Sequence, residues 1–395
     1  MTAYPSWTPA PRPGIVPLHP LPFATILGRS FTALRHNPKV LLGFAVGAQA
    51  IAYLVLVLAT GGVGWAAFSR LDTLATNDPD YDTVLVGSIA ITAATGFVLG
   101  IAATALTVVV QGVVVADVAH GVVAERPRLA DLWRRVRPAF WRLLAYTLLA
   151  TLAILVVLGA VAGVIALIAV SVAGTAGIVV AVLLSLAAVL AAIPLSLWLS
   201  TKLCLVPAVL VLERERLFPA IARSWRLIRG RFWPALGVVV IVQLAFSAIA
   251  QVVSVPLSLL SGVMSATIAP TGDPDPTSVI GLLLTSVLTQ VVVLLIQAVG
   301  LVVSASATTL IYVDCRMRRE GLDLDLVSYV DQRQAGAGPA DPYSWHIGRD
   351  VAAITTTVGT VPPGAPIAPP PPAPPASTPV DPGSPTRWTA PGGDA

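Results

Sequence analysis

The sequence predicts an all-α integral membrane protein with six transmembrane helices arranged as three hairpins. The first observation is composition: 56% of the 395 residues are hydrophobic and 11% are charged, whereas about a quarter of the residues in an ordinary soluble domain are charged. The second is a mean hydropathy of +0.83, with the apolar residues gathered in stretches of about twenty or more, long enough to cross a bilayer. These observations exclude a soluble globular enzyme.

Six apolar stretches have the length of membrane spans. We expect them at about residues 38–60, 84–118, 142–170, 177–212, 234–261 and 278–314. A helix of about 35 residues is roughly 50 Å long, against a hydrocarbon core of about 30 Å, so the second, fourth and sixth spans should tilt, kink or project beyond the bilayer. Pro194 and Pro207 are the expected kinks of the fourth span, because proline removes a helical hydrogen bond.

The basic residues predict the orientation of the chain. The segments 1–39, 120–142, 202–231 and 315–395 carry 4, 6, 7 and 6 lysines and arginines, and the other side carries Arg70 alone. Because these residues concentrate in cytoplasmic loops, both termini should be cytoplasmic. Arginine also far outnumbers lysine, a bias associated with GC-rich bacterial genomes, so we expect a multi-pass protein of a bacterial plasma membrane.

Both ends of the chain are predicted to be disordered, which leaves a membrane domain at residues 23–326. Residues 1–22 contain seven prolines, and residues 335–395 contain 15 of the 34 prolines in the chain. Such segments cannot bury enough apolar area to fold. We expect the C-terminal tail to be plainly solvated, which leaves Trp345 and Trp388 unexplained. The alternative is a ligand for a proline-recognising protein.

Each odd-numbered span is preceded by a segment with one shared pattern, at residues 27–35, 129–137 and 221–229. Apolar residues occupy the first, fifth and eighth positions, which form one helical face, and arginine occupies the ninth. Basic amphipathic helices that lie in the head-group plane have this pattern. The residues expected to contact lipid head groups are Arg29, Arg35, Trp133, Arg134, Arg137, Arg223, Trp225, Arg226 and Arg229. The pattern predicts an internal repeat, although any six-span protein with basic loops repeats crudely in this way.

The second span of each hairpin ends near an acidic residue, namely Asp117, Glu213 or Asp314. A carboxylate at the C-terminal end of a helix interacts unfavourably with the helix dipole, so each is expected to have a partner. The three acids are therefore candidates for structural ion pairs, and Asp314 with Arg229 is the favoured pair. The alternative is that each acid is merely solvated.

Three stretches of the chain carry a resemblance to a known family. They are residues 13–21 ahead of the first span, 223–233 ahead of the fifth, and 312–323 after the sixth. They resemble bacterial membrane proteins named after the membrane domain of glycerophosphoryl diester phosphodiesterases, over roughly residues 13–326. The resemblance implies a six-span helical protein, often without an attached catalytic domain, and it implies no defined activity.

The sequence predicts no enzyme activity, cofactor or metal site. The catalytic domain of such phosphodiesterases holds a metal through clustered carboxylates and histidines on a barrel. The four histidines of this chain have no carboxylates at ligand spacing, and no α/β segment of about 250 residues is present.

Glutamines are the main polar residues in the middle of the spans. They are Gln111, Gln243, Gln251, Gln290 and Gln297. Glutamine suits hydrogen bonds between membrane helices, and we favour this packing role. Gln290 and Gln297 lie seven residues apart on one helical face and could instead line a hydrated path.

These features predict a non-catalytic structural or lipid-interacting membrane module whose partners are anionic lipid head groups at the cytoplasmic face. Nucleic acid is not an expected partner, because the basic residues flank the spans. The alternative function is a transporter or permease for a lipid-derived or small amphipathic substrate that moves between the hairpins. Formation of a homo-oligomer stays open.

Overall fold

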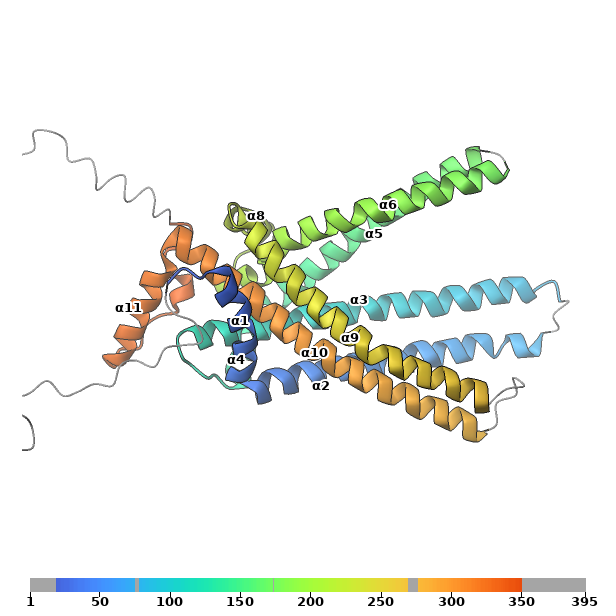
Figure 1. The fold of residues 1–395 in the computed structure, drawn as a ribbon, viewed down its shortest axis with the longest axis horizontal. Helices are drawn as coiled ribbons and strands as arrows, with labels where there is room; N and C mark the ends of the chain where they lie inside the picture. The colour runs from blue at the N-terminus through green and yellow to red at the C-terminus, as the bar shows by residue number, and fades with distance from the viewer. Residues whose placement is uncertain (1–18, 75–77, 173, 269–275, 350–395) are drawn as a thin grey trace, which may run out of the picture. The chain divides into compact units, whose positions relative to one another are not determined.

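The computed structural model describes residues 19–74, 78–172, 174–268 and 276–349, and within them the chain forms helices and no strand. Six helices are long and apolar enough to cross a membrane (Figure 1). They are α2 (Pro38–Phe68), α3 (Tyr81–Val122), α5 (Phe140–Ser171), α6 (Thr175–Leu203), α9 (Phe232–Ile268) and α10 (Pro276–Glu320). The all-α, six-span prediction is confirmed.

Shorter helical elements precede, connect and follow the long helices. They are α1 (Phe23–His36), α4 (Leu129–Val136), α8 (Leu217–Ile228) and α11 (Leu322–Gln334), with the brief turns η1 (Leu71–Thr73), η2 (Arg137–Ala139), α7 (Val206–Ala208), η3 (Val209–Glu213) and η4 (Pro342–Ser344). Helices α1, α4 and α8 coincide with the three basic amphipathic segments. Each precedes the first long helix of a hairpin.

The long helices pair as α2 with α3, α5 with α6, and α9 with α10, which we call the first, second and third hairpins (Figure 1). The first and third hairpins pack together, because α10 contacts both α2 and α3. The second hairpin contacts α3 through α5 and α9 through α6. The most apolar stretches of α5 and α6 have none of their residues buried by the protein, so lipid or another protein must cover them.

The packed core lies where the helix ends converge. Buried residues concentrate in the last third of α3, in residues 205–212, and in α10 from Val302 to Met317. We call this end of the hairpins, where α2 and α9 begin and α3 and α10 finish, the basic end, since the arginine-rich segments lie there. Tight packing at this end fixes how the basic helices α1, α4 and α8 are held.

Of the two prolines expected to kink the fourth span, Pro207 interrupts the helix and Pro194 does not. Helix α6 runs continuously through Pro194 and ends at Leu203. Pro207 has no N–H to donate to the carbonyl of Leu203, so the regular helix stops there. The chain continues as α7 and then as the π-helical turn η3, which carries buried Glu213.

Residues at both edges of the membrane domain pack against it, so the prediction of disorder was wrong for residues 19–22 and 335–349. Leu21 is fully buried, and its N–H donates to Asp314 Oδ1 at 2.8 Å. Tyr343 is 2% exposed, and its hydroxyl donates to the carbonyl of Ala119 at 2.9 Å. The remaining parts of the predicted tails, residues 1–18 and 350–395, lie outside the described residues.

Helix α11 was not predicted. Its first residues alternate leucine and aspartate, a period of two that is typical of a strand. The buried residues Leu322 and Leu326 nevertheless lie four apart on one face of the helix. Tyr329 of this helix donates its hydroxyl to Glu125 Oε1 at 2.8 Å, and burial together with that carboxylate raises the pKa of Tyr329 to about 12.

Candidate functional site

Most residues predicted to contact lipid head groups lie on the surface of the basic end. Eight of the nine are exposed, namely Arg29, Arg35, Trp133, Arg134, Arg137, Trp225, Arg226 and Arg229. The ninth, Arg223, is buried. The surface is therefore arginine-rich and also presents indole rings.

The three basic helices turn equivalent aromatic rings outward. Phe31 of α1, Trp133 of α4 and Trp225 of α8 are 43%, 39% and 37% exposed. The residue just before each ring is fully buried, as Ser30 and Ser224 illustrate. The indole rings of Trp133 and Trp225 suit head-group depth, because each has an apolar body and a polar N–H, whereas Phe31 offers only apolar surface.

Helix α8 presents the most complete group of such side chains, which we call the α8 patch: Lys202, Trp225, Arg226 and Arg229. The Lys202 ammonium lies 5.5 Å from the ring centroid of Trp225, within the range of a cation–π interaction. Trp198 packs edge-on against Trp225 at 5.2 Å. The patch thus continues from the end of α6, whose apolar surface the protein leaves uncovered, onto the exposed side of α8.

The prediction that Arg223 contacts lipid was wrong. Its Nε donates to the carboxylate of Glu213, and its Nη2 donates to Glu320 Oε2 at 2.9 Å. Burial alone would lower the pKa of Arg223, but the hydrogen bonds and charges of Glu213 and Glu320 outweigh burial and raise the pKa above its usual value. The guanidinium is therefore a fixed charge inside the protein, on the side of α8 that packs against η3 and α10.

Arg223 belongs to a buried network that we call the Glu213 cluster: Glu213, Arg223, Tyr312, Arg316 and Glu320. Tyr312 donates to Glu213 Oε1 at 2.7 Å, and Arg316 Nε donates to Glu320 Oε2 at 2.8 Å. Arg316 Nη1 donates to the Tyr312 hydroxyl at 3.0 Å. Two guanidinium groups thus balance two carboxylates, which is the condition under which buried charges are tolerated.

Asp314 has a partner, but it is not the predicted Arg229. Arg231 Nη2 donates to Asp314 Oδ2 at 2.7 Å, and Arg318 Nε donates to Oδ1 at 2.8 Å. Arg229 is exposed at the end of α8. The chain then turns at Gly230, whose φ of +91° suits glycine. After this turn, Arg231 faces α10 and reaches Asp314.

Asp117 bonds a neutral amide. Asn37 Nδ2 donates to Asp117 Oδ1 at 3.1 Å. Asn37 and Arg231 occupy equivalent places, each two residues after the arginine at the ninth position of the shared pattern and each just before the first long helix of its hairpin. Each bonds the acid at the end of the second helix of the same hairpin. The second hairpin differs, because Glu213 is bound by the α8 residue Arg223 instead.

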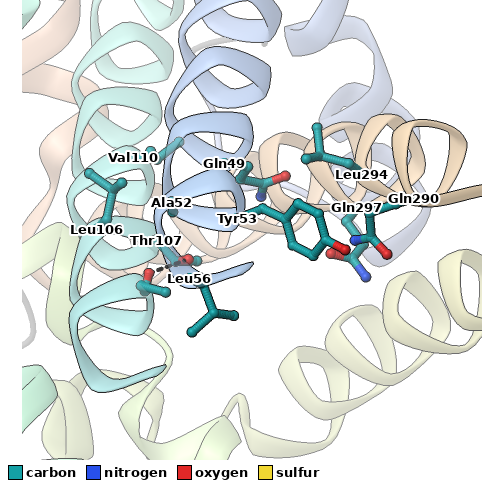
Figure 2. Close-up of a pocket in the computed structure, with 11 residues that line it drawn as sticks. Gln49, Ala52, Tyr53, Leu56, Leu106, Thr107, Val110, Gln290, Leu294 and Gln297 are labelled. Carbon is teal, nitrogen blue, oxygen red and sulfur yellow. Dashed lines mark hydrogen bonds between the residues drawn. The ribbon is translucent and has the colours of Figure 1, made fainter. Parts of the chain in front are cut away.

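A second polar site lies between the first and third hairpins (Figure 2). Two adjoining cavities there share Gln49, Thr107 and Gln297 in their linings. The glutamines that line them are Gln49, Gln111, Gln243, Gln290 and Gln297. The sequence had suggested four of these residues separately, and it gave no reason to single out Gln49. The exposed Gln251 lines neither cavity.

No group of three or more histidine, cysteine, aspartate or glutamate side chains arranged to hold a metal ion occurs among the described residues.

A family model matches residues 21–313, which include all six long helices except the final turns of α10. The description of that model is a domain of unknown function, DUF7847. No curated protein and no solved structure matches the chain. Since the match covers most of the chain, the protein belongs to the DUF7847 family.

Proposed function

We propose that the protein is a non-catalytic, lipid-interacting membrane module that binds anionic head groups at the cytoplasmic face of a bacterial plasma membrane. The α8 patch carries this proposal, because it combines exposed arginines with an outward indole ring at the end of a hairpin that the protein leaves uncovered. Each basic residue close to an anionic surface contributes about 1 kcal/mol of binding free energy.

Buried contacts support the proposal by holding α8 in one orientation. Arg223 pairs with Glu213 and Glu320 on the inner side of the helix. Ser224 Oγ donates to the carbonyl of Lys202 at 2.7 Å, which ties α8 to the end of α6. A binding surface whose residues are fixed from behind loses less conformational entropy when a head group binds.

Replacing Arg226 and Arg229 together by glutamine should weaken the binding of phosphatidylglycerol to the purified full-length protein. The expected loss is up to about 2 kcal/mol, or roughly 30-fold in affinity, since two charges leave the surface. Native mass spectrometry with added phosphatidylglycerol measures it. The matched control is Arg70→Gln, an exposed arginine outside the patch. Unchanged phosphatidylglycerol binding, or an equal loss with phosphatidylcholine, would contradict the electrostatic part of the proposal.

The proposed orientation places both termini in the cytoplasm, on the basis of the asymmetric distribution of arginine and lysine. Single cysteines at Thr76, Thr175 and Thr271, in a variant without Cys204 and Cys315, should react with a membrane-impermeant maleimide added to intact cells. A cysteine at Ser384 should react only after the cells are opened. Labelling of Ser384 in intact cells would refute the inward C-terminus.

The purified protein should hydrolyse no glycerophosphodiester with any divalent metal, because the four histidines lack carboxylates at ligand spacing in the sequence. Release of glycerol phosphate is the measurement, with Mg²⁺, Mn²⁺, Ca²⁺ and Zn²⁺ each supplied in turn. Metal-dependent turnover that persists through a second purification step would overturn the non-enzyme proposal.

The relation to the membrane domain of glycerophosphoryl diester phosphodiesterases stays a prediction, and so does the triple repeat.

A transporter for a lipid-derived or small amphipathic substrate is the second candidate. The observation that favours it is the glutamine-lined space between two hairpins, since transporters bind substrate near the middle of the bilayer where repeated elements meet. Movement of a labelled amphiphile across proteoliposomes, dependent on the protein, would favour this candidate over a static module.

A further inference from the structure

Two adjoining polar cavities lie between the first and third hairpins, away from the basic end. The larger has a volume of about 420 Å³ and the smaller about 170 Å³. Helices α2 and α3 line both cavities together with α10, and α9 completes the larger one through Gln243 and Phe246. The larger volume alone is within the range of about 300–1,000 Å³ that is typical of small-molecule sites.

Polar side chains converge on this space without satisfying one another. Figure 2 shows Tyr53 of α2 facing Gln290 and Gln297 of α10, with Gln49 one helical turn before Tyr53. No hydrogen bond joins the side chains of Gln49, Tyr53, Gln290 and Gln297 to one another in Figure 2. Gln49 Oε1 is buried and has no hydrogen-bond partner in the described part of the chain. A buried acceptor of this kind is costly unless another group bonds to it.

The proposed orientation in the membrane places the site at the depth of the hydrocarbon core. Gln49 follows Lys39 by ten residues and Gln243 follows Arg231 by twelve. At about 1.5 Å per residue, the two glutamines are roughly 15 and 18 Å along their helices from the basic end. With Lys39 and Arg231 at the membrane surface, as proposed above, and a hydrocarbon core about 30 Å thick, both glutamines lie near the middle of the core. A ligand that reaches them from the bilayer must itself be partly apolar.

Gln49 and Gln243 also occupy equivalent positions in their hairpins. Gln49 is twelve residues after Asn37, and Gln243 is twelve residues after Arg231. Asn37 and Arg231 are the two residues that close the first and third hairpins by bonding Asp117 and Asp314. The cavity is therefore built at the meeting of two hairpins that each supply a glutamine from the same place.

The residues that line the cavities carry no charge. None is an aspartate, glutamate, lysine, arginine or histidine, and Tyr53 is the one weakly acidic group among them. Amides donate and accept hydrogen bonds, as a ligand with hydroxyl groups requires. Apolar side chains such as Leu106, Leu294 and Phe246 complete the lining and can contact an alkyl chain.

We propose that this glutamine-lined cavity binds the head group of a neutral, hydroxyl-bearing, single-chain amphiphile. The hydroxyls bond Gln49, Gln243 and Gln297, and the chain extends along the apolar lining. The site is separate from the α8 patch, and its occupancy does not depend on whether the ligand is moved across the membrane.

The test is binding of 1-monooleoylglycerol to the full-length protein, measured by native mass spectrometry after removal of co-purified lipid. The variants are Gln49→Leu and Gln243→Leu, which keep the side-chain size but lose the amide. Each should lower the affinity for monooleoylglycerol at least tenfold. Oleate, which has the same chain and a charged head, should bind the wild type at least tenfold more weakly than monooleoylglycerol.

Gln251→Leu is the matched control, because Gln251 is an exposed glutamine of the same helix as Gln243 but lines neither cavity. It should bind monooleoylglycerol like the wild type. The melting temperature of each variant separates loss of the site from loss of the fold. The Arg226→Gln, Arg229→Gln double variant should keep monooleoylglycerol binding, so the two proposals fail independently. Wild-type affinity in both cavity variants that remain folded, or no saturable binding to the wild type, would overturn the proposal.

Discussion

Replacing Arg316 by leucine is expected to lower the free energy of unfolding by about 3–5 kcal/mol, the usual cost of removing one partner of a buried ion pair. Arg316 is fully buried and bonds Glu320 and Tyr312, and it also donates to the carbonyl of Tyr343 at 2.8 Å. Leucine would leave the buried carboxylates of Glu213 and Glu320 with one guanidinium between them. Thermal unfolding of the purified protein in detergent measures the loss.

The control for Arg316 is an arginine that pairs in solvent. The Arg134 side chain is 82% exposed and donates to Asp131 at 2.9 Å. Exposed pairs of this kind contribute about 1 kcal/mol or less, so Arg134→Leu should change the melting temperature little. Arg316→Lys should keep the charge and still destabilise the protein, because an ammonium cannot reproduce the fork of donors that Arg316 directs to four acceptors. Equal melting temperatures for the Arg316→Leu and Arg134→Leu variants would show that the Glu213 cluster does not hold the basic end together.

The six helices could be predicted from sequence because crossing a bilayer imposes a length and a composition on each segment. The same rule cannot show which hairpins touch. The cavity arises because the third hairpin packs on the first, so that Gln243 and Gln297 come close to Gln49 and Thr107. Only the common spacing of Gln49 and Gln243 behind the hairpin-closing residues could have indicated this from the sequence.

The sequence pattern also could not predict which side of each basic helix faces the protein. Helix α8 has arginines on more than one side, and periodicity alone does not state which of them faces protein. Contact with η3 and α10 buries Arg223 and leaves Arg226 and Arg229 exposed. Glu320, six residues after Asp314, was a clue that Arg223 is buried. The buried carboxylates of Glu213 and Glu320 require two cations, which are Arg223 and Arg316.

The segments after the sixth span show the limit of composition as a guide. Residues 335–349 contain glycine and proline, which suggested a solvated tail. In the structure, Arg316 fixes this segment by donating to the carbonyls of Tyr343 and Trp345 at 2.8 and 3.1 Å. A buried arginine with spare donors can order a backbone that has little hydrophobic area of its own.

A double-mutant cycle between Asp314 and Arg231 should reveal a coupling free energy of about 1.5–3 kcal/mol, the value of a hydrogen bond between charged groups. The variants are Asp314→Asn, Arg231→Gln and their combination, compared by thermal unfolding in detergent. Asp314 is 1% exposed and receives hydrogen bonds from Arg231, Arg318 and the N–H of Leu21. Its loss should therefore be the largest single effect in the cycle, and the combination should cost less than the sum of the single variants.

The matched control replaces Arg229 by glutamine in the same cycle. Arg229 is two residues before Arg231, has the same charge and is exposed, so its effect should add to that of Asp314→Asn within about 0.5 kcal/mol. A difference between the two cycles separates a specific contact from the general attraction of Asp314 for a basic surface. If Arg229 couples to Asp314 as strongly as Arg231 does, the contact seen here does not close the third hairpin. The parallel between Asn37 with Asp117 and Arg231 with Asp314 would then lose its energetic basis.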